Sequence, residues 1–170
     1  MLKNVKESLN KLAKYVVQQS RSNLTKNKKN VSKSLYNSID YNLNVSPNSF
    51  SLSFIMDEYG MYQDKGVSGK KKKYNTPFRY TNKMPPIKPL ADWAKFKNIR
   101  LRNEKGQYSK GSYQTIGFLI ARSIFNKGIK PSLFFTKPFE ASFKNLPNEV
   151  VEAFNLDIKD LLQFTTRWEK

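Results

Sequence analysis

The sequence contains no cysteine and no histidine. Their absence excludes disulfides, thiolate nucleophiles, zinc sites built from nitrogen and sulfur ligands, and imidazole bases. No apolar run approaches the roughly 18 residues that span a bilayer, and the N-terminus alternates charged with apolar residues instead of forming a signal-peptide core. With 38% hydrophobic and 14% aromatic residues, the chain is too apolar to stay disordered. We expect a folded protein, made in the cytosol, that is not an enzyme and has no cofactor, metal or membrane partner.

Acidic residues are scarce, with 13 Asp and Glu against 31 Lys and Arg and a formal net charge of +18. The excess lies within residues 1–140, because residues 141–170 carry four basic and five acidic side chains. Of the basic residues, 25 are Lys and six are Arg. Reading of DNA bases favours the arginine fork, so this composition does not favour sequence-specific DNA binding. The charge indicates that residues 1–140 tolerate or seek an anionic surface.

Glycine and proline are absent before Pro47, which lets a helix run. Leu, Val and Ala recur every three to four residues over 2–20, with lysines on the other faces, so the spacing predicts an amphipathic helix there. A membrane-surface helix would show the same stripe, but the lack of interfacial Trp or Phe favours packing on a sheet or a neighbouring subunit. From residue 41 the period changes to two and predicts a β-hairpin over about 41–56.

The rest of the chain predicts a long basic loop rich in Pro and Gly over 66–89, two central helices, and a C-terminal helical segment over 138–164. The apolar stripe of that segment includes Phe143, Phe154 and Ile158. The first central helix should start near Pro86 and turn Trp93 inward. The pattern predicts a single domain over 1–170 of the α+β class, in which N-terminal, central and C-terminal helices pack on a small antiparallel sheet.

Four consecutive lysines within the loop form the most conspicuous chemical feature. They suit contact with a phosphate backbone, and they equally suit a solvated loop tip. Aromatic residues lie among these cations, where they could stack nucleic-acid bases or belong to a subunit interface. The candidate interface or anion-contacting residues are Tyr59, Tyr62, Lys70, Lys71, Lys72, Lys73, Phe78 and Arg79. Asp57, Glu58 and Asp64 are the clustered carboxylates that a metal-dependent nuclease would need, and this is the third hypothesis.

The order of these signals resembles the neck proteins of tailed bacteriophages, in particular the head-tail joining or tail-completion family. In that family a helix ending in T/S-G-x-L-x-x-S-I leads into strands, and a YAxYxxxG segment follows. The resemblance covers roughly residues 1–145, and a later stretch, 129–135 with Pro138 and Phe139, occupies the place of a basic-Pro-Phe motif. The matching residues of the first two pieces are Ser34, Leu35, Ser38, Ile39, Tyr59, Tyr62 and Gly66.

Gly60 stands at the small position after the first Tyr, the glycine before the helix-end Leu is absent, and the insertion over 70–89 is long. These departures leave tail completion, tail terminator and head closure open. The resemblance implies a structural virion component of the neck, a ring of six or twelve subunits between the portal or connector and the tail proteins, with transient contact to packaged DNA. The alternative is a sequence-nonspecific nucleic-acid-binding protein.

Overall fold

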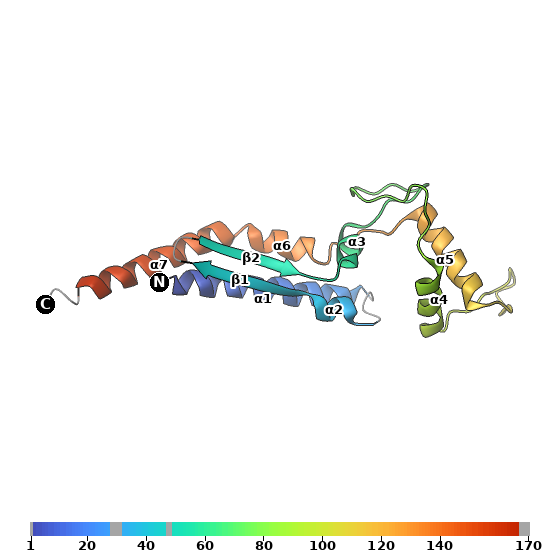
Figure 1. Cartoon of the computed structure of the whole chain (residues 1–170), viewed down its shortest axis with the longest axis horizontal. Coiled ribbons are helices and arrows are strands. Elements are labelled where there is room, and N and C mark those ends of the chain that lie inside the picture. The colour runs from blue at the N-terminus through green and yellow to red at the C-terminus, as the bar shows by residue number, and fades with distance from the viewer. Residues whose placement is uncertain (1, 28–31, 47–48, 167–170) are drawn as a thin grey trace. The chain divides into compact units, whose positions relative to one another are not determined.

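The computed structural model describes residues 2–27, 32–46 and 49–166 (Figure 1). Within them the chain forms two compact units, each described by itself: the first runs to Gly60 and resumes at Leu133, and the second covers Met61–Ser132. The sequence predicted one domain because no linker interrupts it. The elements are α1 (Lys3–Lys26), α2 (Ser34–Ser38), β1 (Asp40–Ser46), β2 (Ser49–Ile55), α3 (Tyr59–Lys65), α4 (Ile87–Phe96), α5 (Tyr113–Lys127), α6 (Thr136–Phe143) and α7 (Leu146–Thr166).

The predicted hairpin is confirmed as the antiparallel pair β1 and β2. Its register sets Tyr41 opposite Phe54 and Leu43 opposite Leu52, so that the apolar residues share one face. Pro47 and Asn48, between the two strands of the predicted hairpin, lie outside the described residues. Figure 1 shows the hairpin running along α1 and along the helices α6 and α7. This arrangement confirms the predicted α+β class.

The first helix is longer than the period alone indicated, since α1 continues past residue 20 to Lys26. Its buried stripe also continues, through Leu24, whose side chain is fully buried with Leu35, Ile39 and Phe134. No proline or glycine interrupts this segment. The added turns bury apolar surface, and this burial stabilises the longer helix. The stripe packs inside the first unit.

The N-terminus of α1 is capped by a carboxylate from the other end of the chain. Asp157 of α7 accepts hydrogen bonds from the backbone N–H of Asn4 at 3.0 Å and of Val5 at 3.1 Å, and from the Asn4 side chain at 2.9 Å. Burial raises the pKa of Asp157, but these hydrogen bonds lower it by more, and the net pKa lies below its ordinary value. A buried carboxylate at a helix N-terminus is stable because the orphan N–H groups and the helix dipole both favour the charge.

The C-terminal helix turns a different face inward from the one that its apolar residues predicted. Ala153 and Asp157 of α7 are buried against α1, whereas Phe154 and Ile158 of α7, and Phe143 at the end of α6, are exposed. The small Ala153 lets the two helix axes approach, and the Asp157 cap fixes which face of α7 meets α1. The large apolar residues are consequently left on the outside of the unit.

Phenylalanine side chains pack β2 against α6. Phe135, Phe139 and Phe143 stack in series, with ring centroids 5.8 and 5.6 Å apart. Phe54 of β2 packs edge-on against Phe135 and Phe139, at 5.3 and 5.9 Å. Offset and edge-on contacts of this kind stabilise a core beyond the area that they bury.

In the second unit α4 packs on α5 through small residues. Ala91 and Ala94 of α4 and Gly117 and Ala121 of α5 are buried. A Cβ at Gly117 would lie 2.9 Å from the Ala91 backbone nitrogen, so the contact requires glycine. The helix begins after Pro86 as predicted, but Trp93 is 40% exposed and does not face the core as predicted, because side chains of that size do not fit between helices this close.

A held lysine run as the candidate functional site

The lysine run is the candidate functional site, and its backbone is held in place at the end of α5. The backbone N–H groups of Lys70 and Lys71 donate to the carbonyls of Phe125 and Asn126, each at 2.9 Å. That of Lys72 donates to Asn126 at 3.3 Å. The last carbonyls of a helix have no partner within the helix, and the negative end of its dipole favours cations. The run therefore caps α5, and we refer to Lys70–Lys73 as the lysine platform.

Two glycines make this close approach of backbones possible. A Cβ at Gly69 would lie 2.3 Å from the carbonyl oxygen of Asn126, and a Cβ at Gly128 would lie 2.1 Å from that of Val67. Gly128 also has a φ of +74°, which an L side chain rarely adopts. Beside them, Val67 and Ile129 exchange backbone hydrogen bonds at 2.9 and 2.8 Å. The residues just before the lysine platform, Val67 and Gly69, therefore lie against the end of α5 and the residues that follow it.

All four platform side chains are exposed, and two of them lie over aromatic rings. The Lys70 ammonium is 5.6 Å from the ring centroid of Phe125, and the Lys72 ammonium is 5.5 Å from that of Tyr74. Cation–π attraction favours these positions. The platform presents a set of positive charges from an ordered backbone, so a polyanion or an acidic surface binding there would order little additional chain.

Aromatic residues that lie near the lysine platform in the sequence have ring partners. Tyr62 packs edge-on against Phe78 at 4.7 Å, and Tyr80 lies 6.2 Å from Phe125. Burial raises the pKa of the Tyr80 phenol. These rings pack within the second unit, although base stacking needs open ring faces and Tyr62 is still 45% exposed.

Arg79 and Tyr59 complete the predicted set. Arg79 is exposed, and it lies on a short bridge in which the Ser68 N–H donates to the Phe78 carbonyl and the Tyr80 N–H donates to the Ser68 carbonyl. The structure therefore brings Phe78 and Arg79 into the same unit as the platform. Tyr59 is 43% exposed and belongs to the first unit.

Two of the three clustered carboxylates, Asp57 and Asp64, have structural partners, and Glu58 is exposed. Asp57 accepts a hydrogen bond from the Ser34 hydroxyl at 2.8 Å, which ties α2 to the end of the hairpin, and Asp64 is buried. Within residues 2–27, 32–46 and 49–166, no three Asp or Glu side chains are grouped so that they could hold a metal ion. No helix in that part of the chain is long and apolar enough to cross a membrane.

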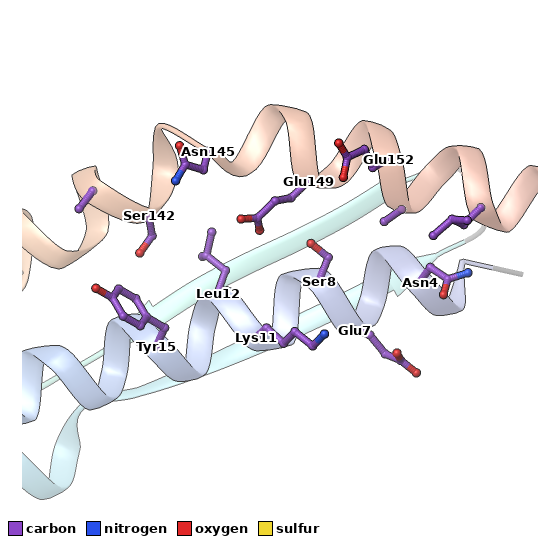
Figure 2. Close-up of a pocket in the computed structure, with 13 residues that line it drawn as sticks. Asn4, Glu7, Ser8, Lys11, Leu12, Tyr15, Ser142, Asn145, Glu149 and Glu152 are labelled. Atoms are coloured by element: carbon purple, nitrogen blue, oxygen red, sulfur yellow. The ribbon is translucent and has the colours of Figure 1, made fainter.

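Sequence reasoning missed a groove of about 640 Å³ between α1 and the helices α6 and α7 (Figure 2). Its charged lining residues are Glu7, Lys11, Glu149 and Glu152. The signal that could have located it is the near-neutral charge of residues 141–170 in an otherwise cationic chain. We call it the acidic groove.

Comparisons with family models, with curated proteins and with solved structures give no match to this chain.

Proposed function

We propose that the protein is a structural component of the phage neck, a ring that joins the portal or connector of the head to the tail tube. The proposal starts from the resemblance of residues 1–145 to the head-tail joining family. Such a role needs surfaces for neighbouring subunits and no catalytic group. The first unit offers such a surface on α7.

The observation that carries the proposal is an apolar face of α7 that no described residue covers. Val151, Phe154 and Ile158 recur at spacings of three and four, which places them on one side of the helix. They are 59%, 47% and 39% exposed. We call these three residues the apolar flank. Grouped exposed apolar side chains mark interaction surfaces, because leaving them in water forfeits their transfer free energy.

Charge supports the apolar flank as a contact between subunits. Two copies of a +18 chain repel one another, and the repulsion is smallest where the local charge is near zero. The flank lies within residues 141–170, the one segment without a basic excess. A ring repeats one heterologous interface until it closes, and neck rings add contacts to the rings above and below.

The experiment is a mass measurement by light scattering and sedimentation, together with electron microscopy of negatively stained particles. The wild-type chain should form closed particles whose mass is six or twelve times 19.8 kDa. The double variant Val151→Ser/Phe154→Ser should shift the equilibrium towards monomer by at least about tenfold. Ile55→Ser, at an equally exposed apolar residue on β2, is the matched control and should assemble normally. A wild-type chain that stays monomeric at every concentration would refute the proposal.

One observation favours the alternative of sequence-nonspecific nucleic-acid binding, namely the ordered backbone of the lysine platform. A protein that neutralises phosphates releases counterions, so its affinity for DNA falls steeply with salt. Lys71→Glu/Lys73→Glu should then flatten that dependence. A monomer that binds an oligonucleotide with a steep salt slope would replace the neck proposal by this one.

A further inference from the structure

The acidic groove holds carboxylates that have no cation paired with them. Glu149 and Glu152 come from α7, Glu7 and Lys11 from α1, and the groove therefore carries three carboxylates to one ammonium. None of the three glutamates forms an ion pair with a described residue. In a chain of net charge +18, unpaired acidic residues on a single groove are unexpected, because cations are plentiful everywhere else.

A second, independent observation concerns Ser8. Ser8 is a half-buried residue that lines the same groove, and its hydroxyl oxygen is buried without a hydrogen-bond partner among the described residues. Figure 2 shows the Glu149 carboxylate lying between the two helices, on the side of Ser8 and Leu12. A buried polar atom without a partner costs free energy unless a ligand or partner satisfies it. The groove is therefore polar at its floor and negatively charged at its rim.

The remaining lining suits long side chains with a cationic end. Leu12, Tyr15 and Leu156 supply an apolar wall. A lysine buries its methylene stem along such a surface and keeps its ammonium at the polar edge. The groove is thus chemically fitted to lysines that project from a fixed backbone.

We propose that the acidic groove of one copy receives the lysine platform of the next copy. The inference rests on the proposed ring and adds a second contact between neighbouring copies, on the same helix α7 that carries the apolar flank. The groove belongs to the first unit and the platform to the second, so the contact is heterologous and can repeat around a closed ring. The charges are opposite in sign, because four lysines meet a groove with three glutamates and one lysine. A held platform loses little freedom on docking, because its backbone is already bonded to α5.

The test uses charge reversal on each side of the contact. The groove variant is Glu149→Lys/Glu152→Lys, and the platform variant is Lys71→Glu/Lys73→Glu, which leaves the two lysines that lie over rings in place. The groove variant sets new lysines against the platform lysines, and the platform variant lowers the platform's net charge from +4 to zero and sets two glutamates against the groove. Each variant alone should therefore associate at least tenfold more weakly than the wild-type chain. An equimolar mixture restores an opposite-charge pair at every contact, and should recover particles in which the two variants alternate.

Recovery on mixing also shows that both variants fold. The charge-matched controls are Glu58→Lys/Glu104→Lys and Lys83→Glu/Lys88→Glu, all at exposed positions outside the groove and the platform, and they should assemble like the wild-type chain. The wild-type association should weaken as salt is raised, because the contact is ionic.

The outcomes separate this inference from the proposed function. If the wild-type chain assembles and the groove or platform variant assembles equally well, the pairing is wrong while the ring stands. If the variants fail alone and also fail when mixed, the groove and platform do not meet. If the platform variant loses affinity for an oligonucleotide and keeps its assembly, the platform serves nucleic acid instead. A wild-type chain that never assembles refutes the proposed function itself.

Discussion

Replacing Asp157 by alanine is expected to lower the free energy of unfolding of the first unit by about 2–3 kcal/mol. The carboxylate accepts three hydrogen bonds from Asn4 and Val5, at 3.0, 2.9 and 3.1 Å. The residue at the N-cap position of α1, Leu2, provides no side-chain hydrogen bond of its own. Removal of Asp157 therefore leaves two backbone N–H groups of the first turn without an acceptor, at a buried position.

The stabilisation by Asp157 depends on pH. The pKa of Asp157 is lower in the folded protein than the ordinary value of about 3.9. Its stabilisation is therefore fully present above the unfolded pKa and is lost as the pH falls through the lower, folded pKa. The difference in stability between the wild-type chain and Asp157→Asn should be constant from about pH 5 to pH 7 and should shrink below about pH 4.

Urea denaturation followed by far-ultraviolet circular dichroism measures both effects. Asp157→Asn retains one carbonyl acceptor and should lose less stability than Asp157→Ala. Glu140→Gln, at an exposed carboxylate of α6, serves as control and should change the free energy of unfolding by less than about 0.5 kcal/mol. Equal stability of Asp157→Ala and the wild-type chain at pH 7, or a difference that persists unchanged at low pH, would refute the capping argument.

Three further predictions concern other contacts, each measured as a free energy of unfolding. Gly128→Ala should cost more than about 2 kcal/mol, because its Cβ would meet a backbone oxygen at 2.1 Å, whereas Gly106→Ala has the same sign of φ but no atom within 4 Å and should cost about 1 kcal/mol. Equal costs would show that the close approach is unimportant. Arg21→Lys should cost about 1–2 kcal/mol, since the guanidinium donates to the carbonyls of Tyr36 and Ile39 at 3.0 and 2.9 Å; an unchanged midpoint would contradict that link. Phe134→Ala should cost about 3–5 kcal/mol because the ring is fully buried, and a loss below about 1 kcal/mol would place it outside the core.

The hairpin and the first helix were predictable because their signals are local. Alternation from Tyr41 to Phe54 selects one face of two strands, and a one-residue slip would move every apolar side chain to the wrong face. The apolar stripe of α1 is likewise visible from the spacing of residues within the helix itself. The start of α4 after Pro86 follows from the fixed φ of proline.

The candidate site was predictable only as a list of residues. The four lysines were visible, but their role in capping α5 depends on carbonyls more than fifty residues later in the chain. The acidic groove joins residues near both ends of the sequence, and no local pattern connects them.

The sequence by itself determined the hairpin, most of α1, the start of α4 and where the basic excess stops, since these follow from spacing and composition. Only the tertiary structure decided which face of α7 is buried. The large apolar side chains of Phe154 and Ile158 would bury more apolar surface, yet Ala153 and Asp157 are the residues that face α1. A small side chain permits close packing and a carboxylate satisfies the first turn of α1, and both advantages exist only when the two helices are already side by side.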